Sequence, residues 1–195
     1  MYEKVGKQTI TDFTNGFNGT IFAYGQSGSG KTFSMLGPEE VTDSLAIDFK
    51  SVPEDVQKLY GITVRAVIQI FETINEGTAH GNIYKLSCSY IEVYNEKIKC
   101  LLTKKDDLKI RENPAGGMYV ADKEERSCMT PESIFECIST ATKNRAVVAT
   151  NQNSRSSRSH TILMMIIDQV GVDGSKKTSL LNLVDLAGSE RVYFY

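Results

Sequence analysis

Apolar residues recur along the chain with two spacings, every second position in some segments and every third or fourth in others. Alternation that includes β-branched and aromatic side chains predicts strands, and a spacing of three to four predicts helices. The predicted strands are residues 19–24, 82–95, 161–170 and 178–185. The last two are joined across Asp173-Gly174, a pair typical of a hairpin turn.

The helical pattern is clearest at residues 64–74, where apolar positions repeat at three and four and Gly77 supplies a stop. Another helix is predicted to start at Pro131, with Thr130 as its N-cap. Residues 4–16 favour a weaker helix that ends at a glycine.

Shorter segments complete the pattern. Residues 97–102 favour a short helix or turn, and residues 108–112 and 118–120 favour a small hairpin. Residues 37–61 are a polar connector with an acidic bias. Because strands and helices are mixed throughout and no linker or repeat divides the chain, we expect one α/β domain over residues 1–195, with a mixed sheet.

Composition narrows the class of protein. Hydrophobic residues make up 41% and charged residues 24% of the 195 residues, which is typical of a folded globular chain. Since 22 basic residues face 24 acidic ones, the net charge of −2 gives no whole-chain attraction for nucleic acid. The longest apolar run, residues 162–167, is far shorter than the roughly 20 residues that span a bilayer, so no membrane insertion is expected.

The cysteines indicate a reducing compartment. Cys88, Cys100, Cys128 and Cys137 include no Cys-x-x-Cys pair, and the chain has only two histidines. This spacing favours four reduced thiols in a cytosolic protein over a zinc site or a disulfide framework. The first ten residues lack the apolar core of a secretory signal.

Residues 25–32 match the pattern G-x-x-x-x-G-K-[ST] and lie between a predicted strand and a helical stretch. In such a loop the glycines let backbone N–H groups cradle phosphates, Lys31 reaches the β- and γ-phosphate oxygens, and Thr32 ligates Mg²⁺. The strand context disfavours the alternative of a plain glycine-rich turn. The residues expected to hold a nucleotide are Gly25, Gln26, Ser27, Gly28, Ser29, Gly30, Lys31 and Thr32.

Asp185 ends an apolar strand and is followed by Gly188 and Glu190. A carboxylate at this place holds Mg²⁺ in nucleotide hydrolases, often through water, and the N–H of Gly188 is free to face a γ-phosphate. Taken alone, residues 185–190 fit an ordinary strand end followed by a turn equally well.

Residues 153–160 are polar throughout and lie between a predicted helix and a predicted strand. Their hydroxyls could complete the coordination of Mg²⁺ and position a water molecule, and an arginine could pair with a carboxylate across the site. Composition alone favours a solvated basic loop or a phosphorylation site, and an ordinary structural role for His160.

Together these segments resemble the kinesin motor family. Residues 18–26, N-G-T-I-F-A-Y-G-Q, are similar to the family's approach to the phosphate loop, and residues 89–96, S-Y-I-E-V-Y-N-E, to a further hallmark. Residues 153–160 resemble its first switch, N-x-x-S-S-R-S-H, and residues 185–190 resemble its second switch. Three motifs in the same order overturn the interpretation of the serine-rich stretch as a solvated loop.

The resemblance implies a P-loop NTPase fold, a mixed central sheet flanked by helices, and hydrolysis of ATP with Mg²⁺ coupled to microtubule binding. It implies that Phe33 packs on adenine and that the hairpin at residues 113–120 is a secondary microtubule-contacting loop, with a plain β-turn as the alternative. The implied catalytic residues are Ser156, Ser157, Arg158, Gly188 and Glu190, with Arg158 and Glu190 as an ion pair that closes the switches. The implied Mg²⁺ ligands are Thr32, Ser157 and Asp185, the last through water.

The family pattern extends past both ends of this sequence. Its first strand, with an arginine–proline motif, has no counterpart before Tyr2, and its main microtubule-binding helix and neck have none after Val192. We therefore expect these 195 residues alone to expose strand edges, bind nucleotide weakly, hydrolyse it poorly and not move. The expected location is the cytoplasm and its microtubule cytoskeleton, with the oligomeric state set by a stalk outside the sequence.

Two other functions stay open. A generic P-loop NTPase or kinase would not need the serine–arginine switch, so Arg158→Ala would leave its turnover intact. A non-catalytic nucleotide or microtubule adaptor would bind an ATP analogue without releasing phosphate, and Lys31→Ala would leave that binding unchanged.

Overall fold

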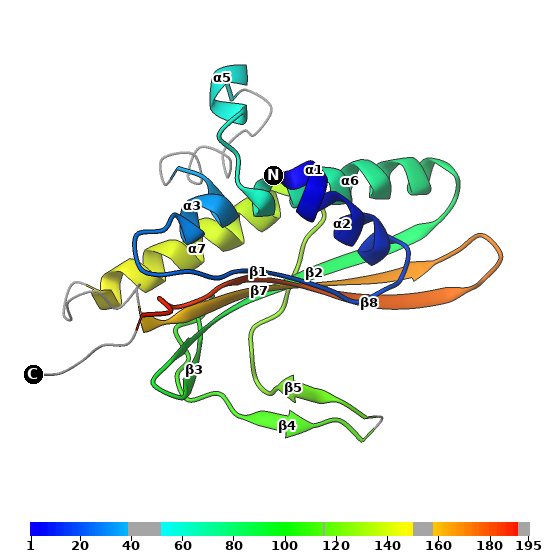
Figure 1. Cartoon of the computed structure of the whole chain (residues 1–195). Coiled ribbons are helices and arrows are strands. Elements are labelled where there is room, and N and C mark those ends of the chain that lie inside the picture. Colours follow the sequence, from blue (N-terminus) through cyan, green and yellow to red (C-terminus); the bar gives the residue numbers. More distant parts are fainter. Residues whose placement is uncertain (39–51, 115, 150–157, 191–195) are drawn as a thin grey trace, which may run out of the picture.

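Figure 1 shows the computed structural model, which describes residues 1–38, 52–114, 116–149 and 158–190. Its central sheet has the order β1-β8-β7-β2-β3, with β6 also paired to β2. Its strands are β1 (Gly19–Ala23), β2 (Ile83–Tyr94), β3 (Lys97–Cys100), β6 (Arg126–Ser127), β7 (His160–Val170) and β8 (Lys176–Asp185). Because β1 runs parallel to β8 while the other neighbours are antiparallel, the sheet is mixed, as predicted.

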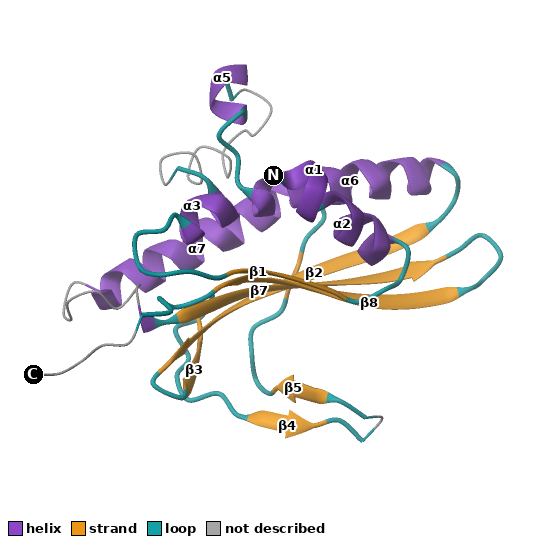
Figure 2. Cartoon of the chain, in the orientation of Figure 1, coloured by secondary structure: helices purple, strands orange, loops and turns teal. Residues whose placement is uncertain are grey.

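The described helices lie over one face of this sheet, and a small separate hairpin stands off the other face (Figure 2). The helices are α1 (Tyr2–Val5), α2 (Lys7–Thr14), α3 (Lys31–Leu36), α5 (Glu54–Gln57), α6 (Ile62–Ala79) and α7 (Pro131–Ala149). The hairpin pairs β4 (Ile110–Glu112) with β5 (Met118–Val120), as the sequence predicts.

Alternation along the strands decides which side chains enter the core. On β7 and β8, Leu163, Met165 and Leu181 are fully buried between half-exposed neighbours. They belong to one apolar cluster that also contains Phe13 of α2 and Ile138 of α7. The apolar stripes of the helices are therefore buried on the sheet, which supplies the main stabilising term of such a layered fold.

A predicted helix N-cap and a predicted hairpin turn are confirmed. The backbone N–H of Ser133 donates to Thr130 Oγ1 (3.4 Å) and that of Thr130 donates to Ser133 Oγ (3.3 Å), so Thr130 caps the helix that starts at Pro131. Gly174 takes a φ of 78° in the turn between β7 and β8, a value that favours glycine.

The prediction of a short helix or turn at residues 97–102 is wrong for residues 97–100, and only residues 101–102 form a turn. Residues 97–100 form β3, which pairs with β2 in a tight hairpin where Tyr94 faces Lys97. The two turn residues Asn95 and Glu96 have φ angles of 49° and 59°, the geometry that matches the twist of hairpin strands. Glutamate is uncommon in that conformation, so the sequence carried only a weak hairpin signal.

The predicted stop at Gly77 is also wrong, because α6 continues to Ala79. A Cβ built on Gly77 would overlap the phenol of Tyr84 on β2, so this glycine allows close packing of helix on strand. The weaker helix predicted over residues 4–16 forms as two pieces, α1 and α2. Of the predicted polar connector, residues 39–51 lie outside the described residues.

Candidate functional site

Because β1 and β8 are parallel neighbours, their carboxyl ends meet at one edge of the sheet. Ala23 pairs with Asp185 at that edge. The phosphate loop, residues 25–32, leaves β1 there, and residues 185–190 leave β8 beside it, with the N–H of Ser189 donating to Gly25 O (3.0 Å). Two of the three predicted site segments therefore lie side by side, at the kind of edge where open α/β sheets bind ligands.

The backbone of the phosphate loop turns at two glycines before α3 begins at Lys31. Gly28 and Gly30 have φ angles of 75° and 85°, a region that side chains rarely adopt. A Cβ at either position would meet no heavy atom of the described residues within 4 Å, so backbone conformation and not crowding requires glycine here. The open space around both residues leaves their backbone accessible to a ligand.

The Lys31 side chain folds back over the phosphate loop. Its Nζ donates hydrogen bonds to the backbone carbonyls of Gly25 (3.0 Å) and Gln26 (2.9 Å). The ammonium group is therefore held at the mouth of the loop by two neutral acceptors. Phosphate oxygens are stronger partners for this cation because their charge assists the hydrogen bond.

Thr32 and Asp185 join the two segments directly. The Thr32 hydroxyl donates to Asp185 Oδ2 at 2.5 Å. Asp185 is only 8% exposed, and its other oxygen, Oδ1, is buried with no hydrogen-bond partner among the residues that the structure describes. A buried carboxylate oxygen without a partner is costly, and an oxygen-preferring cation would relieve that cost. The donor set at this point fits Mg²⁺.

Glu190 of the predicted second switch binds the phosphate loop. Its carboxylate accepts from the backbone N–H of Ser27 (2.8 Å) and from the Ser27 hydroxyl. These hydrogen bonds lower the pKa of Glu190 below its usual range. A Cβ on Gly188 would collide with the Glu190 carboxylate and the Ser27 hydroxyl, so a glycine is needed for this close contact.

The predicted first switch is described only in part. Ser156 and Ser157 lie outside the described residues, so their predicted roles stay predictions. Arg158 is exposed, and the ion pair between Arg158 and Glu190 is absent from the described contacts, where Ser27 holds Glu190 instead. His160, for which composition suggested only a structural role, accepts a hydrogen bond at Nδ1 from the backbone N–H of Ala187 (3.0 Å). It thereby ties the end of the first switch to the second.

The sequence analysis did not identify a polar contact between α7 and β2 that reaches Ser159, directly before β7. Arg145 of α7 donates from Nη2 to Ser159 Oγ (3.0 Å) and lies 3.6 Å from the Glu92 carboxylate of β2. Glu92 is 1% exposed. The signal was present in the sequence, because Glu92 follows Leu86 and Tyr90 on the buried face of an alternating strand, where a carboxylate requires a partner.

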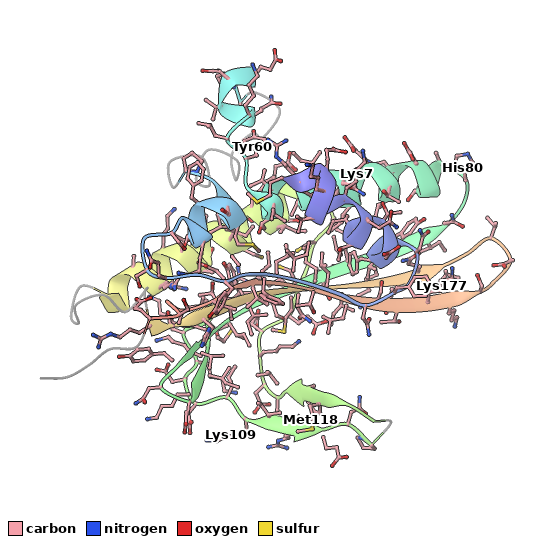
Figure 3. All side chains as sticks on the ribbon, viewed as in Figure 1. Lys7, Tyr60, His80, Lys109, Met118 and Lys177 are labelled. Atoms are coloured by element: carbon pink, nitrogen blue, oxygen red, sulfur yellow. The ribbon has the colours of Figure 1, made fainter. Side chains whose placement is uncertain are left out.

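Phe33, the residue expected to pack on adenine, is 53% exposed directly after the phosphate loop. It lines a pocket of about 410 Å³ between α1, α3 and the start of α6. Tyr2 and Tyr60 supply aromatic walls, and Arg65 and Lys58 supply positive charge. Figure 3 labels Tyr60 beneath α5. The pocket can accept a flat ring system with a polar edge.

The small hairpin that the resemblance linked to the microtubule is exposed. Ile110 is 58%, Met118 68% and Tyr119 45% exposed. Figure 3 places Met118 and Lys109 on this outlying hairpin, away from the helices. The structure thus confirms the hairpin, while its microtubule contact stays a prediction.

Nearly the whole chain is similar to kinesin motor domains. A family model described as the kinesin motor domain matches residues 1–193. Kinesin-related protein 5 of Dictyostelium discoideum is 45% identical over 194 residues, and the kinesin heavy chain of Syncephalastrum racemosum is 40% identical over 188 residues. These matches cover 98% and 95% of this chain but 18% of either relative, so the chain spans less than a fifth of their length.

A solved structure of a fast kinesin superimposes on the chain with a TM-score of 0.84 at 38% identity. The match covers 98% of this chain and 50% of that kinesin chain. The predicted α/β fold of P-loop NTPase type, with a mixed sheet flanked by helices, is therefore confirmed. Together with the family match over residues 1–193, this similarity shows that the chain belongs to the kinesin motor domain family.

Proposed function

We propose that the chain binds ATP with Mg²⁺ at the edge formed by the phosphate loop and Asp185, and hydrolyses the terminal phosphoanhydride bond. The contact between Thr32 and Asp185 beside Lys31 carries this proposal. It brings a hydroxyl, a lysine ammonium and a buried carboxylate to one place, and one oxygen of that carboxylate has no partner among the described residues. Oxygen ligands of this kind suit Mg²⁺, which would neutralise charge on the transferred phosphate.

In this proposal the loop holds the triphosphate. Its backbone N–H groups bind phosphate oxygens, Lys31 exchanges its two carbonyl partners for the β- and γ-phosphates, and Phe33 packs on the base. Thr32 ligates the cation directly, Asp185 holds it through water, and Ser157 completes the set. The nucleotide-holding residues are Gly25, Gln26, Ser27, Gly28, Ser29, Gly30, Lys31, Thr32 and Phe33.

The proposed hydrolytic residues come from both switches. Ser156 and Ser157 position the attacking water, and the N–H of Gly188 faces the γ-phosphate. Arg158 and Glu190 pair when both switches close, which requires Glu190 to leave Ser27. Since both partners are exposed in the described arrangement, this pair can form and break with the state of the nucleotide.

We propose that the whole protein works on microtubules, as its family membership suggests, in the cytoskeleton of the cytoplasm. Residues 1–195 would act as one motor-type domain, with the β4–β5 hairpin as a secondary microtubule contact. In the part of the chain that the structure describes, no helix is apolar and long enough for a membrane crossing. Because this chain covers half of the matched kinesin chain, we expect the 195 residues alone to turn ATP over slowly.

The test measures binding of a fluorescent ATP analogue and release of phosphate for the wild type and two lysine variants. Lys31→Ala removes charge-assisted hydrogen bonds of about 1.5–3 kcal/mol, so affinity should fall about 10- to 150-fold. Lys177→Ala is the matched control, since Lys177 also donates to a backbone carbonyl (3.3 Å) but lies on β8 far from the loop. Equal affinity of the wild type and Lys31→Ala would refute the proposed site.

A third variant separates the alternatives. Arg158→Ala should keep nucleotide binding and lose phosphate release, because the switches no longer close. Unchanged release would favour a generic NTPase, and binding without release in the wild type would favour an adaptor.

A further inference from the structure

Three of the four cysteines, far apart in sequence, meet in the core. Cys88 lies on β2, Cys128 directly follows β6, and Cys137 lies on α7. Their exposed fractions are 1%, 2% and 2%. Sequence spacing gave no sign of this cluster, because the pairing of β6 with β2 and the packing of α7 over β2 bring the thiols together.

The three sulfur atoms have the separation that one shared ion requires. All lie within 4.8 Å of one another, and Cys128 Sγ is 3.6 Å from Cys88 Sγ. Three sulfurs bound at about 2.3 Å to one central atom lie about 4 Å apart when that atom is in their plane, and roughly 3.4 Å apart when it is a pyramidal centre such as trivalent arsenic. The observed spacing therefore needs shifts of only a few tenths of an ångström to about one ångström.

We propose that Cys88, Cys128 and Cys137 form a buried three-sulfur site for a single soft, three-coordinate ion. Thiolates select such thiophilic ions over hard cations. Among the residues that the structure describes, no histidine, carboxylate or fourth cysteine places a ligand atom in this group. Zn²⁺ prefers four ligands in closed structural sites, so the site is a poor match for zinc.

Charge narrows the choice of ion. Three thiolates around Cu(I) carry a net charge of −2, which burial penalises. Three thiolates around trivalent arsenic form a neutral complex, which burial does not penalise in this way. Trivalent arsenic is thus the better match. Cu(I) is the second candidate, because it also prefers thiolate ligands.

The binding step with arsenite is a ligand exchange without oxidation. Arsenous acid, As(OH)₃, and three Cys–SH groups give As(S–Cys)₃ and three water molecules, because each thiol proton leaves with one hydroxide. Three As–S bonds replace three As–O bonds. The bound arsenic would link Cys137 on α7 to Cys88 on β2 and to Cys128 directly after β6.

The experiment uses the reduced 195-residue chain, free of oxygen, with native mass spectrometry and thermal unfolding as readouts. We expect one arsenic atom per folded chain, with a mass gain of one arsenic less three protons, and a higher melting temperature. Cu(I), supplied as its acetonitrile complex, is the second arm, and Zn²⁺ is the four-coordinate comparison. Binding of one equivalent of arsenic, of Cu(I), or of either one in its own experiment supports the site. The experiment that shows binding identifies the ion.

Variants decide whether the three thiols act together. Mutation of a residue that only hydrogen-bonds to a ligand of a bound metal usually weakens metal binding by about 10- to 100-fold. Cys137 is itself a proposed ligand, so Cys137→Ala should weaken arsenite binding more than about 100-fold. Cys137→Ser is a second variant that preserves side-chain size. Cys100→Ala is the matched control, because Cys100 is equally buried at 0% exposure on β3 but stands outside the cluster.

Three results would overturn the proposal. The first is no bound arsenic or copper in the folded, reduced wild type. The second is binding by Cys137→Ala or Cys137→Ser that equals the wild type, or binding lost in Cys100→Ala. The third is Zn²⁺ binding tighter than Cu(I) binding, which would show that a fourth ligand completes the site.

Discussion

Replacing Asp185 by asparagine should stabilise the nucleotide-free chain, although Asp185 is a proposed site residue. One carboxylate oxygen accepts from Thr32 at 2.5 Å, and the other is buried and has no partner within the described part of the chain. An unpartnered buried polar group costs about 1–3 kcal/mol, and more if charged. Asparagine keeps the shape and the Thr32 contact and puts an uncharged amide Nδ2 in the place of Oδ1. A neutral polar group costs less to bury than a carboxylate oxygen, so we expect a gain of about 1–2 kcal/mol. This gain raises the melting temperature by about 2–8 °C in a chain of this size.

The assay is urea unfolding at pH 7 without nucleotide, followed by the same measurement with Mg²⁺ and a nucleotide. Asp168→Asn is the matched control, because Asp168 also accepts from a threonine hydroxyl, Thr178 (2.6 Å), but is exposed. Its substitution should change the free energy of unfolding by less than about 0.5 kcal/mol. The only intended difference between the two pairs is burial.

Adding Mg²⁺ and nucleotide should reverse the order of stability, because the wild type gains a cation ligand that asparagine replaces poorly. The reasoning fails if Asp185→Asn lowers the free energy of unfolding without nucleotide by more than about 1 kcal/mol, or if Asp168→Asn gives the same gain.

Two further outcomes can be measured on the same preparation. Gly77→Ala should destabilise the chain in urea unfolding, although alanine is the better helix former, because its Cβ overlaps the Tyr84 phenol; an increase in stability would contradict this packing. The contact between Glu190 and Ser27 should hold at pH 7 and be lost only as pH falls below the ordinary glutamate pKa of 4.5, because hydrogen bonding lowers the Glu190 pKa. The protection factor of the Ser27 amide, which is its exchange rate compared with the intrinsic rate at the same pH, should therefore fall at low pH, and Glu190→Gln should remove most of that dependence.

Local patterns predicted the fold well wherever one segment carried its own signal. The alternation in residues 161–170 and 178–185 gave β7 and β8, and the phosphate loop gave a strand, a turn and a helix in order. Because β1 and β8 are parallel neighbours, their carboxyl ends, Ala23 and Asp185, meet at the same edge of the sheet. These features rest on periodicity and on glycine φ angles, which residues near one another in sequence determine.

Contacts between distant residues could not be predicted in this way. Glu190 meets Ser27 across 163 positions, and Cys128 meets Cys88 across 40, because the order of strands in the sheet decides both. The hairpin at Asn95-Glu96 was missed for another reason. Strand pairing there imposes a positive φ angle on Glu96, a residue type that rarely adopts one, although Asn95 before it favours such a turn.

The position of Glu190 suggests how nucleotide binding could act on the second switch. The backbone N–H of Ser27 donates to Glu190 in the described arrangement, yet the same N–H belongs to the loop that is proposed to bind phosphate. One donor cannot serve both acceptors fully, so phosphate binding and the contact between Glu190 and Ser27 oppose each other. In the proposed site, a phosphate that takes this donor would release Glu190, which would then become available to Arg158. Nucleotide and second switch would thereby be coupled by competition for one N–H group, with a difference in contacts between two states.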